Sequence, residues 1–239
     1  MTRRKSKSWG GGGAVKTLLY GGGIVLLITT FFLLTLRVVN PPGTMLMVVR
    51  YVERELSSGS AKKETAQGGW MWKPLRDISP NMQRAVIVAE DARFLQHRGI
   101  DLGSLFSVIE GEKRKSRRAR GASTITMQTV KNLFLWPGRS YIRKGVELIA
   151  SVPFDLLVGK RRVLEIYLNI VEWGPGVYGV EAASRRYFDK SAKSLTSSES
   201  AALAAVLPSP LTTSPRELTP VARKRYSRIV REAPAIRLP

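Results

Sequence analysis

An uncharged apolar segment near the N-terminus sets the first limit on the architecture. Residues 17–36, between Lys16 and Arg37, contain no charged side chain. A helix of this length, at about 1.5 Å per residue, crosses the ~30 Å hydrocarbon core of a bilayer. A helix buried in a soluble core would instead show a polar face, and only scattered threonines interrupt this segment. The sequence therefore predicts a transmembrane anchor over residues 17–39.

The residues that flank this segment predict its orientation. Residues 1–16 form a basic tail that carries five cations and no acid: Arg3, Arg4, Lys5, Lys7 and Lys16. Positive flanks stay in the cytoplasm, so the rest of the chain should lie outside it. A cleaved signal peptide is the alternative. The apolar region is long for one, and residues 38–42 (VVNPP) do not resemble its cleavage site, which favours an uncleaved anchor.

The charge of the chain indicates an anionic partner. The formal net charge is +21, and +16 remains on residues 17–239. Nucleic acid, anionic lipid and a phosphorylated substrate would all fit such a charge. Six cations fall within residues 113–120, but that stretch has no aromatic side chain for base stacking. Lipid headgroups or a pyrophosphate are therefore favoured over nucleic acid, with a solvated loop as the alternative.

Two residue types limit metal chemistry. The chain has no cysteine and one histidine, which excludes disulfides, thiolate metal sites and clusters of histidines. The sequence therefore predicts no self-contained metal site.

Beyond the anchor, the pattern predicts a mostly α-helical domain over residues 77–239, after a linker and lead-in over residues 40–76. Ser79 and Pro80 are typical of a helix start, and the helical spacing that follows ends near Glu90. Ser123 can cap a helix that runs towards Phe134. No strand-like alternation is evident.

The second half of the domain shows further helix boundaries. Ser140 can cap a helix that Pro153 should kink or divide, and Gly159 should end it. Apolar residues within 163–171 predict the next helix. Residues 196–199 form a capping box before a helix that Pro208 stops, and residues 219–220 open a final basic helix.

Four motifs in a fixed order carry the functional signal. They are residues 90–99 (EDARFLQHRG), 121–128 (GASTITMQ), 143–147 (RKGVE) and 164–169 (LEIYLN). Glu90 follows apolar residues, and burial would raise its pKa towards that of a general base, with Asp91 as a second acid beside it. Arg143 and Lys144 share a helical face with Glu147. They could hold a phosphate, or they could form an ordinary surface ion pair.

Together and in this order, the motifs resemble those of the peptidoglycan glycosyltransferases. That family polymerises a lipid-linked disaccharide into the glycan strands of the bacterial cell wall. The resemblance covers residues 78–210, over half of the chain. It implies a lysozyme-like, two-lobed fold that is mostly α, with the smaller lobe near the membrane. No serine–lysine transpeptidase motifs follow, so a monofunctional enzyme is expected.

The resemblance also implies roles for individual residues. Glu90 would be the general base and Glu147 a second catalytic carboxylate. His97, as a lone histidine, is expected from its residue type to orient the loop after Glu90, with direct proton transfer as the alternative. The residues expected at the substrate are Asp91, His97, Ser123, Thr124, Thr126, Gln128, Lys131, Arg143, Lys144 and Asn169. The chain departs from the family at Met127, where a glutamine is usual, and at Ala122, where glycine is frequent. Met127 cannot make the hydrogen bonds of an amide.

The implied reaction joins two molecules of lipid II and releases undecaprenyl pyrophosphate. Mg²⁺ or Mn²⁺ is expected as a divalent cation, bound largely through the pyrophosphate. The implied location is the bacterial inner (plasma) membrane, with one span and a periplasmic or extracytoplasmic catalytic domain. Expected partners are lipid II, the growing glycan, membrane lipids and other cell-wall synthesis or division proteins, and not nucleic acid.

Two other functions would fit parts of the sequence. A lytic transglycosylase cleaves the same polymer with one glutamate, but cleavage involves no pyrophosphate and leaves the motif of Arg143 and Lys144 without a use. A non-catalytic basic membrane scaffold would explain the charge but not the four motifs.

Overall fold

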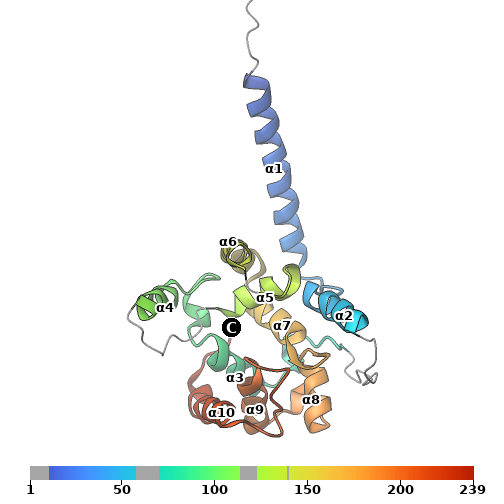
Figure 1. Ribbon diagram of the computed structural model, residues 1–239, viewed down its shortest axis with the longest axis vertical. Coiled ribbons are helices and arrows are strands. Elements are labelled where there is room, and N and C mark those ends of the chain that lie inside the picture. The colour runs from blue at the N-terminus through green and yellow to red at the C-terminus, as the bar shows by residue number, and fades with distance from the viewer. Residues whose placement is uncertain (1–10, 58–69, 114–122, 139) are drawn as a thin grey trace, which may run out of the picture.

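The computed structural model describes residues 11–57, 70–113, 123–138 and 140–239. A long helix, α1, stands out from a helical domain (Figure 1). The helices are α1 (Gly11–Thr35), α2 (Met45–Ser57), α3 (Pro80–Glu90), α4 (Leu102–Lys113), α5 (Ile125–Phe134), α6 (Tyr141–Val158), α7 (Lys160–Ile170), α8 (Val180–Phe188), α9 (Ser197–Val206) and α10 (Pro220–Glu232). Short 3₁₀ turns are η1 (Leu75–Asp77), η2 (Phe94–Gln96), η3 (Ala192–Ser194) and η4 (Ala233–Ala235), and two strands are β1 (Glu172–Gly174) and β2 (Val177–Tyr178). The cations at positions 114–120, Gly121 and Ala122 lie outside the described residues.

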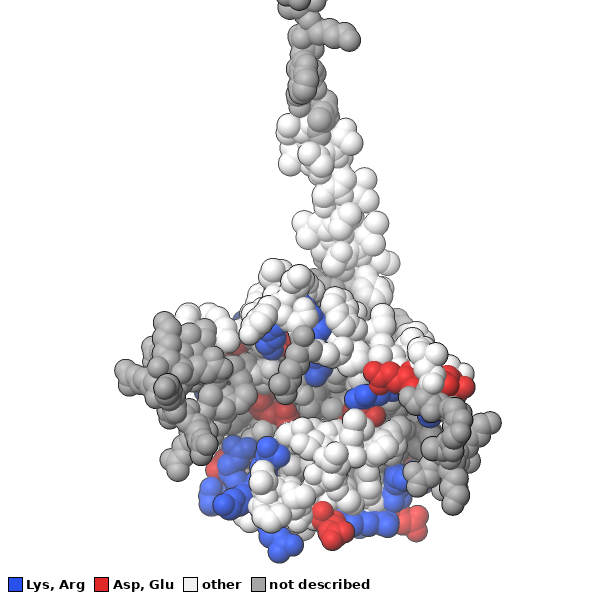
Figure 2. All heavy atoms as spheres, viewed as in Figure 1, with Lys and Arg blue, Asp and Glu red and all other residues white. Residues whose placement is uncertain are grey.

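Helix α1 matches the predicted span in length and composition. Its segment Val15–Thr35 has a mean hydropathy of 2.1, and its large apolar side chains are mostly exposed. Figure 2 shows this column almost free of charged atoms. Among the described residues it is the one helix long and apolar enough to cross a membrane. The helix ends at Thr35, a few residues before the predicted boundary at 39.

Two groups of helices build the domain around a common core. Helix α3 packs on α9 and α10, while α5 packs on α6 and α7. Met82 and Val86 of α3 are buried together with Leu203 of α9 and Ile229 of α10. The α5–α6 group lies on the side of α1, and α3, α9 and α10 lie at the far side (Figure 1). The end of α3 meets the other group at α5, because Gln128 of α5 donates a hydrogen bond to Glu90. Helix α5 in turn packs on α6, which carries the cationic motif.

Most of the predicted helix boundaries are confirmed. Ser79 caps α3 with Pro80 as its first residue, and Thr219 caps α10 in the same way. The capping box of α9 forms between Thr196 and Glu199. Helix α6 ends at Val158, and Gly159 follows as its C-cap with a φ of 85°, which suits a residue without a Cβ.

The predicted cap of α5 was wrong by one residue. Thr124, and not Ser123, is the N-cap: its Oγ1 accepts a hydrogen bond from the N–H of Met127 at 3.1 Å. The same hydroxyl donates to the carbonyl of Gly99 at 2.6 Å. The Gly99 carbonyl, a distant acceptor, therefore favours Thr124 over Ser123 as the cap. The Ser123 hydroxyl is left to bind another partner.

Three further features differ from the sequence-based prediction. Helix α6 continues through Pro153 as one element, since the proline removes a single backbone donor. The segment predicted as a linker contains α2. A short hairpin joins Glu172 to Tyr178 and Gly174 to Val177, and its strands are too short for alternation to be recognised.

Gly99, in the first motif, should tolerate no side chain. Its φ is +84°, and a Cβ there would collide with the backbone carbonyl of Ser151. Gly99→Ala is expected to lower the free energy of unfolding by at least about 1–3 kcal/mol, because strain and collision add. Gly145→Ala is the matched control: a Cβ at this helical position meets nothing within 4 Å, so alanine should stabilise α6. Thermal unfolding of the two variants in detergent measures the contrast. Equal midpoints would contradict the assigned backbone conformation.

Candidate active site

Glu90 ends α3 at the junction between the two groups of helices. Its side chain is half-buried, and desolvation raises the pKa of its carboxyl group above the usual range. A hydrogen bond from Gln128 and the charges of Arg225 and Lys131 act in the opposite direction, while Asp91 adds to the rise. A carboxylate held in this way is partly shielded from water and has a higher proton affinity than a surface glutamate.

The Glu90 carboxylate is oriented by a short relay of hydrogen bonds. Gln128 of α5 donates from Nε2 to Oε2 of Glu90 at 2.6 Å. Tyr167 of α7 donates its hydroxyl proton to Oε1 of Gln128 at 3.2 Å. Because the tyrosine is fully buried, it fixes which end of the amide faces the carboxylate.

Asp91 and His97 hold the loop that follows Glu90. His97 Nε2 lies 2.9 Å and 3.1 Å from the two carboxylate oxygens of Asp91. The backbone N–H of Ile125 also donates to Asp91 Oδ2, at 3.1 Å. Both side chains are thus engaged within the protein, and they tie the first motif to the start of α5. This agrees with the predicted orienting role of His97.

The third motif forms an ion cluster around a buried carboxylate. Glu147, with 2 % of its surface exposed, accepts from Arg143 at 2.8 Å and from Lys144 at 2.9 Å, through different oxygens. Arg143 also donates to the carbonyl of Gly138, and Lys144 donates to the hydroxyl of Ser123 at 3.0 Å. The pairs are not simple surface ion pairs, because the carboxylate they share is buried. Glu147 therefore fixes two cations in one place.

Lys131 connects this cluster with Glu90. Desolvation and the charges of Arg143 and Lys144 lower the pKa of its ammonium group, whereas Glu147 and Glu90 raise it. Desolvation is the largest of these effects. The charge of this lysine on α5 is thus felt by both carboxylates. Because Gln128 of α5 also donates to Glu90, and Ser123 just before α5 accepts from Lys144, the predicted base and the predicted cation cluster belong to one site. Figure 2 shows acidic and basic side chains bordering the hollow between the two groups of helices.

Two other predicted site residues, Thr126 and Asn169, bind the protein framework around the site. Thr126 is fully buried and donates to Asp155 at 2.9 Å, and Asp155 also pairs with Lys160 at 2.8 Å. Asn169 uses its amide to hold the backbone of Lys73, with contacts of 2.7 Å and 2.8 Å. These hydrogen bonds organise α5, α6 and the lead-in. Thr126 and Asn169 were predicted to contact substrate, and in the structure they bind other parts of the protein.

The expected Mg²⁺ or Mn²⁺ fits this site only if the substrate supplies most of its ligands. Among the described residues, no group of three histidine, aspartate or glutamate side chains could hold a metal ion. Both oxygens of Glu147 are engaged by cations. A divalent ion at this site would therefore depend on oxygens that the substrate brings.

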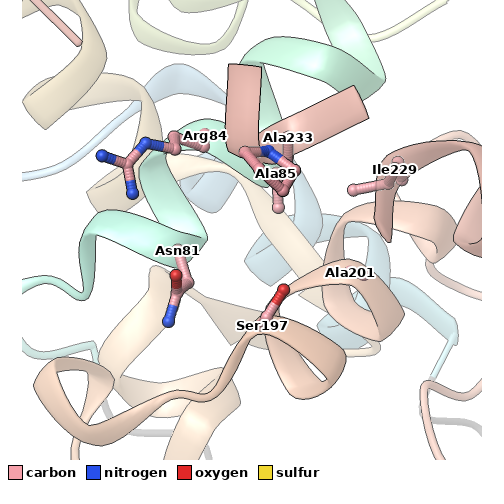
Figure 3. Close-up of a pocket in the computed structure, with 8 residues that line it drawn as sticks. Asn81, Arg84, Ala85, Ser197, Ala201, Ile229 and Ala233 are labelled. Carbon is pink, nitrogen blue, oxygen red and sulfur yellow. The ribbon is translucent and has the colours of Figure 1, made fainter. Parts of the chain in front are cut away.

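A separate hollow lies away from this chemistry. It has a volume of about 190 Å³ and is formed by α3, α9, α10 and η4, with Arg84, Ser197 and Ile229 among its lining residues (Figure 3). No carboxylate lines it. It lacks a candidate base, so we do not place the site there.

Comparison with known proteins decides the family. The profile of the family described as transglycosylase matches residues 59–233, most of the chain. The chain belongs to the transglycosylase family. A relative named biosynthetic peptidoglycan transglycosylase from Caulobacter vibrioides is 48% identical over 176 residues, which are 73% of this chain and 71% of the relative. Proteins of the same name from Haemophilus influenzae (43% over 197 residues, 79% and 80%) and Pectobacterium atrosepticum (54% over 140 residues, 59% and 57%) are also similar.

Membership of the transglycosylase family confirms the predicted mostly α, lysozyme-like domain. Met127, the departure from the usual motif, is fully buried in this transglycosylase. An apolar side chain suits such a position, because a buried amide would need partners for its donors and acceptor. Met127 thus contributes packing to α5.

Sequence reasoning missed two residues of the site. Tyr167 falls among the residues within 163–171 whose apolar spacing predicts a helix, and its hydroxyl also orients Gln128. Arg225 was noted only as part of a basic helix, although its charge lowers the pKa of Glu90. Its neighbour Arg228 donates to the carbonyls of Val88 and Ala89 at the end of α3. Basic residues within a predicted last helix were the only available signal.

Removing the Gln128 amide should shift the pH dependence of the enzyme. The amide donates to the ionised form of Glu90, so Gln128→Leu is expected to raise the pKa of that carboxyl further. A base works when it is deprotonated, so the acidic limb of the profile of kcat/KM should move to higher pH. Gln96→Leu, at an exposed position, is the control and should leave the limb in place. A limb that is unchanged or moves to lower pH in Gln128→Leu would contradict the relay.

Proposed function

We propose that this chain is a membrane-anchored peptidoglycan glycosyltransferase that polymerises lipid II into glycan strands. The observation that carries the proposal is that α5 and its start link a half-buried carboxylate to a cluster of cations. Gln128 of α5 donates to Glu90 at 2.6 Å, and Ser123, just before α5, accepts from Lys144 at 3.0 Å. A base and an anion-binding cluster are the two parts that this reaction needs. The relatives are named biosynthetic peptidoglycan transglycosylases, which agrees with glycan-strand synthesis.

Glu90 would act on the acceptor sugar. The 4-hydroxyl of the N-acetylglucosamine of lipid II attacks C1 of the lipid-linked N-acetylmuramic acid of the donor. The new C–O bond forms as the bond from C1 to the pyrophosphate oxygen breaks, and Glu90 takes the hydroxyl proton. The leaving group departs as undecaprenyl pyrophosphate. Attack on the face opposite the leaving group inverts the anomeric centre.

The cations would act on the leaving group. Negative charge grows on the pyrophosphate as the bond to C1 breaks, and Lys131, Arg143 and Lys144 supply fixed positive charge for it. Arginine offers paired N–H donors that match phosphate oxygens, and lysine adds a point charge. Glu147 holds two of these cations, so we assign it a positioning role in this step. Mg²⁺ or Mn²⁺, bound mainly by the pyrophosphate, would further neutralise the leaving group.

We further propose that α1 crosses the bacterial inner membrane once, with the N-terminus in the cytoplasm and the catalytic domain outside. Its length, its hydropathy and the basic tail before it support this orientation. Lipid II and the growing glycan would then be reached from the outer leaflet. Other cell-wall synthesis or division proteins fit as partners on that side.

The topology predicts the fate of a reporter fused after Asn40. A periplasmic or extracellular reporter, such as one that matures only outside the cytoplasm, should be active there. The fusion should also keep residues 1–39, because the anchor is not removed. Cytoplasmic reporter activity would contradict the orientation, and a mature protein that begins near Asn40 would contradict the anchor.

Purified protein with lipid II tests the proposed activity. With Mg²⁺ present, long glycan strands without peptide cross-links should form. The same preparation with Glu90→Gln should form none, which excludes a contaminating polymerase. Loss of product in the wild-type protein under every metal condition would favour the non-catalytic scaffold.

A further inference from the structure

The membrane helix α1 is fastened to the catalytic domain. Leu33 and Leu36 are buried, and the ring of Phe32 packs edge-on against that of Phe134 with centroids 6.0 Å apart. Arg162 of α7 donates from Nε to the carbonyl of Leu36 at 2.9 Å. Its Nη2 reaches the carbonyl of Val39 and the side chain of Asn40 as well. Arg162 therefore holds both the backbone and a side chain of the segment that follows α1. The depth at which α1 leaves the bilayer thus fixes the height of the domain above the membrane.

Helix α2 follows this junction after residues 36–44 and lies beside the foot of α1 (Figure 1). Thr44 caps it, with Oγ1 accepting from the N–H of Met47 at 3.1 Å. On its inner side it packs against α5, and Arg50 pairs with Glu172 of the hairpin at 3.2 Å. These contacts determine which face of α2 points outward.

The outward face of α2 carries an apolar stripe. Met45, Val48, Val52 and Leu56 follow one another at intervals of three, four and four residues, which places them on one side of a helix. Between 40% and 82% of the surface of each is exposed. A stripe with this spacing normally faces a core. Here it faces outward. Glu55 borders the stripe beside Val48, while Arg50, Glu53 and Arg54 lie on other sides of the helix.

We propose that α2 is a second membrane contact, an amphipathic helix that lies in the interface of the bilayer beside α1. The bilayer is the occupant that the structure favours, since a helix rigidly joined to a transmembrane anchor meets the lipid surface before any soluble partner. An exposed apolar stripe that is bordered by charged side chains is typical of helices that bind the headgroup region. This inference rests on the proposed anchor role of α1. Two contacts would set the tilt of the domain as well as its height, and so keep the pyrophosphate-binding cations near the headgroups.

The chain has no cysteine, so single introduced cysteines can report depth without a prior deletion. Val48→Cys and Val52→Cys, labelled with a fluorophore, probe the stripe. Glu53→Cys and Arg54→Cys are the matched controls on the same helix. The full-length protein is placed in vesicles of phosphatidylethanolamine and phosphatidylglycerol, with quenchers attached at known depths along the lipid chains. All these positions are exposed, so the labels should not disturb the fold.

The labels at Val48 and Val52 should lie about 5–10 Å below the headgroup level, as interfacial helices do, and those at Glu53 and Arg54 should remain in water. The depth of the labels in the bilayer should therefore alternate with the 3.6-residue period of the helix. Two references separate the causes of failure. A label at Leu27 of α1 should lie within the hydrocarbon, and one at Lys224 of α10 should lie in water.

Water-accessible labels at Val48 and Val52, with a deep label at Leu27, would overturn the proposal for α2 and leave the anchor intact. A shallow label at Leu27 would overturn both, because the anchor itself would be misassigned. Stripe labels that are shielded from water but not quenched by lipid would also overturn it, and would assign the stripe to a protein partner. Because depth is the readout, an inactive preparation tests the inference equally well.

Discussion

Replacing Glu90 by glutamine is expected to lower turnover of lipid II by at least about 10²–10⁴-fold, the usual contribution of a general base. The amide keeps the shape of the side chain but cannot take the proton of the attacking hydroxyl. The environment that raises the pKa of Glu90, chiefly its burial, indicates a carboxylate suited to that task. Folding and binding of lipid II should change little, because the substitution adds no volume.

The measurement compares initial rates at saturating lipid II with binding of lipid II to the same preparation. Glu217→Gln, an identical change at an exposed position, should behave like the wild type. Glu90→Asp keeps the charge on a shorter side chain and should lie between the two. Normal turnover in Glu90→Gln would remove Glu90 from the proposed mechanism.

The second large effect is expected at Arg143. Arg143→Gln should reduce turnover by about 10²–10³-fold, as loss of one preorganised donor to a developing negative charge does in other enzymes. Binding of finished glycan should weaken much less, because the finished polymer brings no pyrophosphate to the cluster. Arg143→Lys should recover part of the activity, since it restores charge but not the planar pair of donors.

Arg231→Gln is the matched control for this charge change. Arg231 pairs with Glu232 at the surface, with 73% and 41% of the two side chains exposed, and such pairs contribute little. Rates and glycan binding should both stay near those of the wild type. If Arg143→Gln lost glycan binding and turnover to the same degree, Arg143 would be a general anchor for sugar rather than a stabiliser of the leaving group.

The residues that could be predicted from the sequence are those whose role depends on local spacing. Each helix cap, at Ser79, Thr196 and Thr219, binds a residue at most three positions away. The partners of the ion pairs within the third motif are likewise three or four positions apart. Burial of Glu90 was also predictable, because apolar residues precede it on the same helix. The order of the four motifs then indicated the family.

The rest depended on contacts between distant parts of the chain. Gln128 and Tyr167 are separated by 39 positions, and nothing local marks the tyrosine hydroxyl as part of the site. Ser123 and Thr124 are equivalent as caps in the sequence, and the carbonyl of Gly99 decides between them. For α2, neighbouring proline, glycine and serine residues suggested a linker, and its apolar spacing was overlooked.

Two predicted substrate contacts, Asp91 and Asn169, illustrate a related limit. A conspicuous polar residue in a motif can serve the backbone instead of the ligand, and the sequence does not separate these uses. Asp91 binds His97 and the N–H of Ile125, and Asn169 binds the backbone of Lys73. Their direct contact with substrate stays a prediction, whereas their structural role follows from the hydrogen bonds.

The central claim is that this site builds glycan strands and does not cut them. One reaction tests it most directly: purified protein is given lipid II and finished glycan together, with Mg²⁺, and both undecaprenyl pyrophosphate and glycan length are measured over time. The site described above predicts release of the pyrophosphate in step with elongation, and no anhydro-sugar ends. Cleavage of the glycan to anhydro-sugars, with lipid II left intact, would contradict it and identify a lytic enzyme.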